Sequence, residues 1–148
     1  MSTKKQLVEL CHNLVDKRIF GYKNEIDHLR DAIENSDKAK DDDEDSGQSK
    51  LSEDLEKNMG YLADAKRSKD YLNLIRLDTK QDTIALGSIV KTNSAIFFIA
   101  ISLGKVNLDN LDYFIISIQS PIGQHLKGKR KGDSFSYNDS HYKILEVN

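Results

Sequence analysis

Five consecutive acidic residues, Asp41, Asp42, Asp43, Glu44 and Asp45, form the densest concentration of charge in the chain. Residues 34–56 hold ten acids against three lysines, whereas residues 1–33 and 57–80 together hold twelve Lys or Arg against eight acids. Carboxylates are the ligands that Mg²⁺ and Ca²⁺ prefer, and one or two suffice for a Mg²⁺ ion that keeps waters or substrate oxygens. Acid runs are more often solvated turns, so the elements that carry this run decide what it can do.

Two segments with helical periodicity flank the acids. From about Lys4 to Ile33, and again from about Leu51 to Ile75, apolar residues recur at steps of three and four. This spacing predicts one apolar stripe on each helix. Neither helix can bury its stripe alone, so we expect an antiparallel coiled-coil hairpin, with intermolecular pairing as the alternative. Residues 35–50 hold no apolar side chain larger than Ala39 and are predicted to form the exposed acidic tip.

Beyond a predicted linker at residues 77–83, the periodicity becomes strand-like. Ser120 and Pro121 have the residue types of a helix N-cap and first helical position, and Gly128 is suited to end that helix. Runs of β-branched and aromatic residues separated by turn formers predict strands; they occupy 89–90, 96–103, 113–118, 135–137 and 142–147. The sequence therefore predicts an α+β protein: a hairpin over 1–76, and over 84–148 a small antiparallel-sheet domain with one short helix.

Bulk properties exclude several classes of function. A formal net charge of −2 argues against general binding of nucleic acid or membrane surfaces. Cys11 is the only cysteine, which fits a reducing compartment. No signal-peptide core is found near the start, and the longest apolar run, 95–101, is too short to span a bilayer. We therefore expect a cytoplasmic protein without a membrane partner or sequence-specific DNA binding.

Residues 116–133, which read ISIQSPIGQHLKGKRKGD, resemble the signature of the C-terminal domain of Gre-type transcript cleavage factors. In that family a strand leads into Ser-Pro-apolar-small, then a helix, then Gly-Lys and Gly-Asp. Residues 142–147, YKILEV, are similar to the end of the same domain. The resemblance implies an FKBP-like fold for this part of the chain. It also implies bacterial RNA polymerase as partner, with Gln119, Ser120, Pro121 and Ile122 in the docking region. Gln119 departs from the acidic residue or Asn of the family pattern.

The same resemblance implies how the tip would act. In the family, the hairpin enters the secondary channel of the polymerase, and tip carboxylates assist the catalytic Mg²⁺ so that backtracked RNA is cleaved. The protein would bind no cofactor alone and would not itself be an enzyme; it would share Mg²⁺ with the polymerase and meet the nascent RNA 3′ end only indirectly. We expect Asp41 and Glu44 to be the shared metal ligands, because they lie nearer the predicted apex, with Glu53 in reserve.

The family tip motif is matched elsewhere. Residues 50–56, KLSEDLE, contain its Leu-Ser-Glu and its later Glu, but Lys50 replaces the working Asp. This replacement leaves open whether the protein stimulates cleavage, inhibits the polymerase, or competes with other channel-binding proteins.

Two other functions match parts of the sequence. From Asp42 to Glu53 the spacing of acids, Ser46 and Gly47 matches a calcium-binding loop between two helices. Prolyl isomerase activity would follow from an FKBP-like fold, but the chain has no Trp for an aromatic-walled pocket. The four histidines lack a zinc-ligand spacing.

Overall fold

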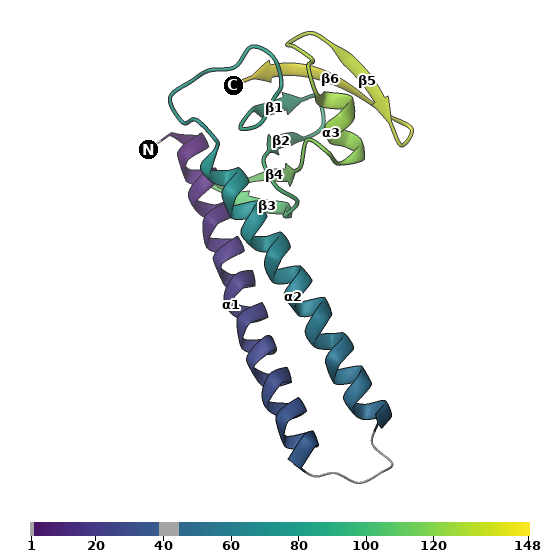
Figure 1. The fold of residues 1–148 in the computed structure, drawn as a ribbon. Helices are drawn as coiled ribbons and strands as arrows, with labels where there is room; N and C mark the ends of the chain where they lie inside the picture. Colours follow the sequence, from purple (N-terminus) through teal and green to yellow (C-terminus); the bar gives the residue numbers. More distant parts are fainter. Residues whose placement is uncertain (1, 39–44) are drawn as a thin grey trace. The chain divides into compact units, whose positions relative to one another are not determined.

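The computed structural model describes residues 2–38 and 45–148. Within this part of the chain, two long helices are followed by six strands and one short helix (Figure 1). The predicted α+β class, a helical hairpin followed by a sheet with a short helix, is confirmed. The chain forms two compact units, one made of Met1–Cys11 with Tyr71–Asn148 and the other of His12–Asp70. We call them the globular unit and the hairpin unit. In the described residues no helix is long and apolar enough to cross a membrane.

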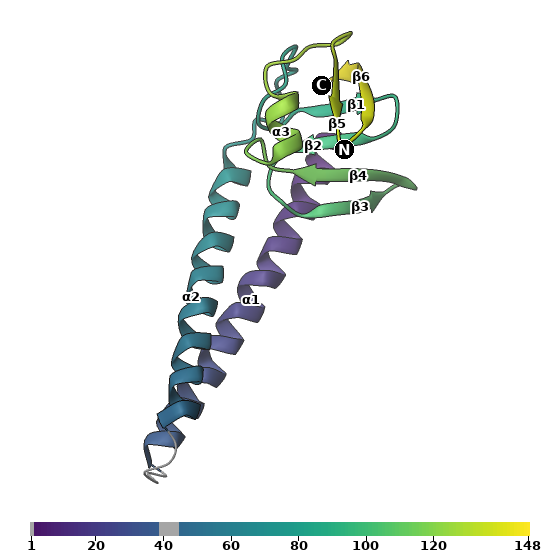
Figure 2. The same ribbon diagram turned by 90° about the vertical axis from the view of Figure 1, so that its right-hand side faces the viewer.

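The two long helices are α1 (Thr3–Lys38) and α2 (Asp45–Asn73), which lie side by side and antiparallel (Figures 1 and 2). Ile26 and Leu29 of the predicted stripe are buried, and Leu62 on α2 is half-buried. Met59 is an exception, since 48% of its surface is exposed. The hairpin is therefore intramolecular, with a narrow apolar seam.

Both helices extend farther than their apolar patterns predict. Residues 35–38 belong to α1 and residues 45–50 to α2, although this stretch was expected to be an open polar connection. Once a helix is nucleated, each further residue adds a hydrogen bond without paying the nucleation cost again. Polar residues can therefore continue a helix beyond its buried seam, and even Gly47 is helical here.

The sheet has the strand order β3-β4-β2-β1-β6-β5. Its strands are β1 (Ile89–Thr92), β2 (Ile96–Ile99), β3 (Gly104–Leu108), β4 (Leu111–Ile116), β5 (Ser134–Tyr137) and β6 (Ser140–Val147). All neighbours are antiparallel except β2 and β4, which are parallel. The expectation of a purely antiparallel sheet was wrong at this pair. After β2 the chain skips one strand position and forms β3, which runs opposite to β2. Strand β4 then lies between β3 and β2 and runs in the same direction as β2.

The β3 strand was not predicted as a separate element. Its residues fell between the strands expected over 96–103 and 113–118. As an edge strand with a largely exposed surface, β3 lacks the apolar run by which the other strands were recognised. Two turns of the sheet are tight: Asp109 and Asn110 have φ of 51° and 65°, and Asn138 and Asp139 have φ of 50° and 64°. Asn and Asp tolerate this left-handed conformation, which closes two-residue hairpins.

The sheet is buried on both faces within the globular unit. On one face, α3 (Pro121–Leu126) places Leu126 in a buried cluster with Phe97 and Ile99. Phe98 is also fully buried, and strand alternation directs it to the opposite face. The base of the hairpin belongs to the same compact unit and contributes buried Leu7, Cys11 and Leu72. The predicted core therefore extends into residues assigned by sequence to the hairpin.

Candidate functional site: the hairpin tip and the α3 corner

The predicted tip residues divide into two groups. Asp41, Asp42, Asp43 and Glu44 lie outside the described residues. Asp45 is the first residue of α2, and its side chain is likewise outside the described part. The chain positions alone put the acid run between the last residue of α1, Lys38, and the start of α2.

The second tip candidate, Glu53, lies on α2 in regular helix. It is eight residues beyond the start of α2, roughly 12 Å along the helix axis at 1.5 Å per residue. Its carboxylate is exposed and lies 3.6 Å from the ammonium of Lys57, one turn later. The family-like motif of residues 50–56 is thus on the side of a helix. A calcium-binding loop does not fit either, because residues 45–53, its fourth to twelfth positions, are helical.

Cross-links between the two helices hold the hairpin together. The ammonium of Lys69 donates a hydrogen bond to the carboxylate of Asp16 at 2.7 Å. The rings of Tyr22 and Tyr61 pack with centroids 5.6 Å apart. Both pairs join α1 to α2, in addition to the apolar contacts of the seam. The helix is continuous at Lys66 and Lys69, where the seam is poor in apolar residues.

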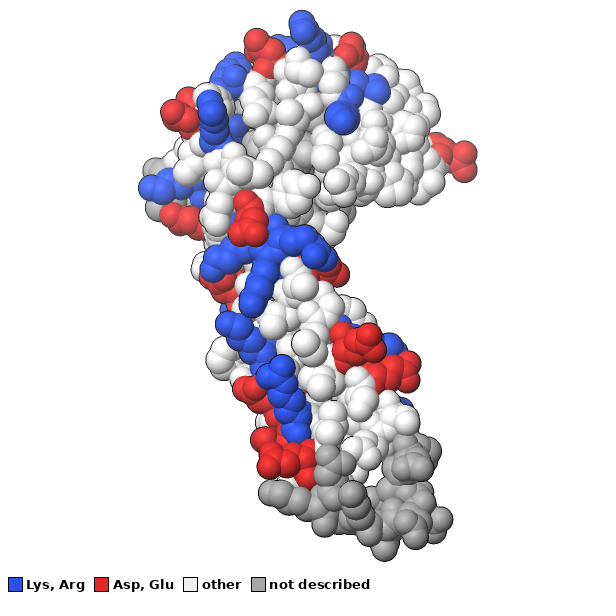
Figure 3. Space-filling view, viewed as in Figure 1, with Lys and Arg blue, Asp and Glu red and all other residues white. Residues whose placement is uncertain are grey.

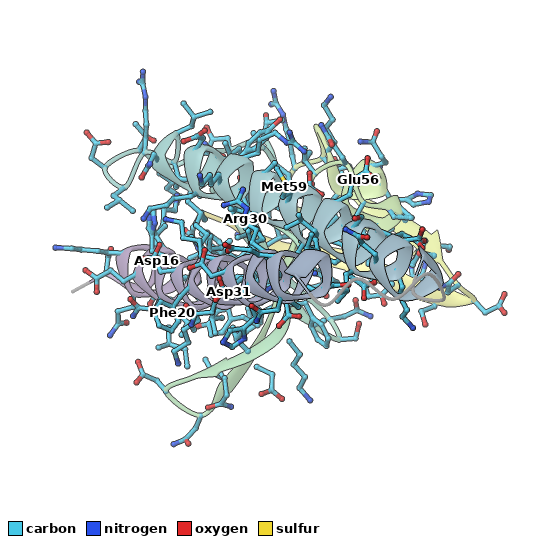
Figure 4. The ribbon with its side chains drawn as sticks, turned by 60° about the horizontal axis from the view of Figure 1, so that its bottom comes forward. Asp16, Phe20, Arg30, Asp31, Glu56 and Met59 are labelled. Carbon is cyan, nitrogen blue, oxygen red and sulfur yellow. The ribbon has the colours of Figure 1, made fainter. Side chains whose placement is uncertain are left out.

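A groove of about 350 Å³ opens between the helices. Lys23, Arg30 and Lys66 provide its cationic lining, against one acid, Asp27. Arg30 of α1 and Met59 of α2 lie across this space from each other (Figure 4). On the face drawn in Figure 3, Lys and Arg side chains form a stripe along the hairpin. The hairpin unit thus has a cationic groove. The charge count of residues 1–33 and 57–80 indicated a net positive charge but not where it gathers.

Phe20 is the most exposed large apolar side chain described, with 68% of its surface accessible. It lies on the side of α1 that faces away from α2 (Figure 4). A single exposed apolar residue is common on protein surfaces and does not by itself indicate a binding site.

The second candidate site is the start of α3 with the residues that precede it, 117–123, which we call the α3 corner. The hydroxyl of Ser120 accepts a hydrogen bond from the backbone N–H of Gly123 at 3.1 Å and donates one to the carbonyl of Ser117 at 2.7 Å. Gln119 and Pro121 are exposed, while Ile122 is half-buried against the core. The predicted N-cap and first helical position are confirmed. The four docking candidates are therefore held on a fixed backbone.

Gly123 makes this corner possible, and sequence reasoning gave it no role of its own. A Cβ atom there would lie 2.2 Å from the carbonyl oxygen of Ser117 and 2.8 Å from that of Ile118. Only glycine permits the helix to pack this closely on the end of the preceding strand. The small residue after Ser-Pro-apolar was the available signal.

Among the described residues, no three His, Cys, Asp or Glu side chains are grouped to hold a metal ion. Cys11 is buried, and this burial raises the pKa of its thiol to about 12. A buried thiol with a raised pKa stays protonated and unreactive near neutral pH.

No family model matches the chain, and no curated protein matches it. Among solved structures, one described as the transcription factor Gfh1 aligns with 95% of this chain and 92% of its own, at 19% identity and a TM-score of 0.35. GreA factor homolog 1 (Gfh1) of Thermus thermophilus is 19% identical, aligns with 95% of this chain and 94% of its own, and gives a TM-score of 0.35. Thermus aquaticus Gfh1 is 20% identical, aligns over 92% of each chain, and gives a TM-score of 0.34. Likenesses this weak assign neither a family nor an activity.

Proposed function

We propose that this protein is a Gre-type factor of bacterial RNA polymerase. In this proposal the hairpin enters the secondary channel, and its acidic tip assists the catalytic Mg²⁺ in cleaving backtracked RNA. The α3 corner docks on the polymerase. The observation that carries the proposal is that Asp41–Glu44 lie in the chain between two long, paired helices, α1 and α2, and that Asp45 begins α2.

The length of the helices supports delivery of these acids to a distant site. At 1.5 Å per residue, the 36 residues of α1 extend about 54 Å and the 29 residues of α2 about 44 Å. A helix pair of that length, joined by Asp16–Lys69 and by the Tyr22–Tyr61 contact, is a stiff carrier for charges at its end.

The chemistry asked of the tip is modest. Mg²⁺ demands octahedral geometry and retains waters, so a few added carboxylates are enough to hold a weakly bound second ion. Two such ions stabilise the attacking and leaving oxygens of an in-line displacement. Asp41 and Glu44 would contribute these oxygens, while the polymerase contributes the remaining ligands and the reaction itself. The protein is therefore a stimulating partner and not an enzyme in this proposal.

Transcript cleavage in stalled complexes of purified bacterial RNA polymerase tests the proposal. We expect the wild-type chain to stimulate cleavage and Asp41→Ala with Glu44→Ala to abolish the stimulation while polymerase binding is retained. Glu53→Ala tests the reserve candidate, whose exposed carboxylate lies on the side of α2, and should leave the stimulation unchanged. Cleavage at the wild-type level by the double variant, or its loss in Glu53→Ala alone, would show that the working acids were wrongly chosen.

A second function is favoured by one observation. Lys50 replaces the working Asp of the family motif, and residues 50–56 lie in regular helix. A protein of this kind would occupy the channel and inhibit transcription without stimulating cleavage. In the same assay it would bind the polymerase, leave the transcript uncut, and reduce elongation in proportion to its concentration.

A further inference from the structure

Four cationic residues are crowded into the turn after α3: Lys127, Lys129, Arg130 and Lys131. We call residues 127–131 the cationic turn. We propose that this turn, together with the cleft beside it, binds an acidic protein segment that carries an apolar side chain. The proposal does not depend on polymerase binding, because the turn is distinct from both the hairpin tip and the α3 corner.

The backbone of the turn is fixed by hydrogen bonds. The N–H of Ile84 donates to the carbonyl of Lys129 at 2.9 Å, and the N–H of Gly128 donates to the carbonyl of Ile84 at 3.1 Å. The carboxylate of Asp133 accepts from the N–H of Arg130 at 2.8 Å. A fixed turn loses little conformational freedom when it binds, so its charges contribute more to affinity than those of a flexible loop.

Among the described residues, these charges have no acidic partner. Lys127, Arg130 and Lys131 are exposed. In the residues that the structure describes, no ion pair within 4.0 Å involves any of the three. Lys129 has no ion pair there either, but its ammonium already donates to the backbone carbonyl of His125. The neighbouring carboxylate, Asp133, is already engaged by the backbone of the turn, so three cations are available to a partner.

A cleft of about 390 Å³ adjoins the turn. Arg130 and Lys131 line it together with Lys80 from the segment before the sheet. Its apolar lining comes from Leu145 and Val147 of β6, and 41% of the Leu145 surface is exposed. A bound segment can therefore place carboxylates on the cations and an apolar side chain on Leu145.

The acids in the cleft select against nucleic acid. Asp82 and Glu146 line the cleft together with its three cations, Lys80, Arg130 and Lys131. A nucleic acid carries a phosphate at every nucleotide and would bring several of them against these carboxylates. A protein segment need not carry a charge at every residue, so neutral residues can lie opposite Asp82 and Glu146 and avoid that repulsion. On the face drawn in Figure 3, Lys and Arg side chains of the globular unit are interspersed with acids, unlike a continuous basic track.

Fluorescence anisotropy with the full chain tests this inference. The probe is a short labelled peptide of Glu, Gly and a few Leu, compared with the same peptide in which Gln replaces Glu. We expect Arg130→Glu with Lys131→Glu to weaken binding of the acidic peptide at least about tenfold, equivalent to about 1.4 kcal/mol. Lys5→Glu with Lys17→Glu is the matched control, because both lysines are exposed on α1 and the change in net charge is the same.

Equal affinity of the wild type and the reversal variant would overturn the proposal, as would equal affinity for the Gln peptide. Tighter binding of a single-stranded oligonucleotide of the same net charge would also overturn it, in favour of a phosphate site. If the reversal variant is unfolded by circular dichroism, Arg130→Gln with Lys131→Gln applies the same test without introducing acids. Leu145→Ser should weaken the peptide further, and an unchanged affinity there would remove the apolar side chain from the proposal.

Discussion

The globular unit and the hairpin unit are stabilised in different ways. In the globular unit, Phe98, Ile115 and Ile144 have no exposed surface, and even the charged Lys4 is largely buried. In the hairpin unit, buried apolar residues form only a narrow seam, and the helices are joined by an exposed ion pair and a pair of tyrosines. The first arrangement fixes a surface such as the α3 corner precisely. The second arrangement forms a long helix pair while burying little apolar surface.

The largest expected difference between the units concerns buried aromatic surface. Phe98→Ala should lower the free energy of unfolding of the globular unit by about 3–5 kcal/mol, because it leaves a cavity at a fully buried position. Met59→Ala, at a position that is 48% exposed, should cost less than about 1 kcal/mol. Urea unfolding followed by near-ultraviolet circular dichroism of the tyrosines, and separately by the helical signal, measures both. Equal losses would contradict the comparison.

A pair of glycines gives a second test, with opposite signs in the two units. Gly123→Ala should destabilise the globular unit by about 2–3 kcal/mol, because the new methyl group would overlap the carbonyl of Ser117. Gly60→Ala on α2 meets no atom within 4 Å and should raise stability by up to about 1 kcal/mol through helix propensity. Thermal unfolding of both variants is sufficient. A tolerated Gly123→Ala would mean that the α3 corner is not rigid.

Buried Lys4 gives a third test, at the base of the hairpin. Its ammonium donates to the carbonyl of Thr79 at 3.3 Å, and burial lowers its pKa. The unfolded chain therefore binds the proton more tightly, so stability rises with pH between the lowered folded-state pKa and the ordinary lysine pKa. Lys4→Met should abolish that alkaline rise and raise the free energy of unfolding near neutral pH, because no charged group is then buried. An unchanged alkaline profile in Lys4→Met would show that another group is responsible.

The smallest expected effect is the ion pair of the hairpin unit. Asp16 and Lys69 are about half exposed, so solvent screens their attraction. A double-mutant cycle with Asp16→Asn and Lys69→Met should give a coupling energy of about 0.2–1 kcal/mol that decreases in high salt. A coupling of several kcal/mol would mean that the hairpin depends on this pair more than on its apolar seam.

These contrasts also explain what could be predicted from sequence. Apolar periodicity located both helices, and the Ser-Pro start of α3 and the Asn138–Asp139 turn were recognisable because specific residue types are needed there. The extension of α1 and α2 into polar sequence was not predictable from periodicity, which marks only buried faces. The parallel β2–β4 pair and the Asp16–Lys69 cross-link depend on chain topology, which local pattern does not encode.

The site was predictable to a lesser extent. The docking candidates 119–122 lie together on one corner because they are consecutive in sequence. The rigidity of that corner depends on Gly123, whose role becomes visible only from its distance to Ser117. The acids at 41–45 stand out in the sequence only because five of them are consecutive. Choosing among them requires knowing which of them contact the partner.

The most direct test of the proposed function is whether the tip reaches the catalytic centre of RNA polymerase. Asp43→Cys can carry a tethered iron chelator that cleaves nearby protein, since Cys11 is buried and, with a pKa of about 12, does not compete for the label. We expect cuts in the polymerase segments that hold the catalytic Mg²⁺, and different cuts from a label at exposed Ser102→Cys in the globular unit. Binding without cuts near the metal, or the same cuts from both labels, would contradict the account.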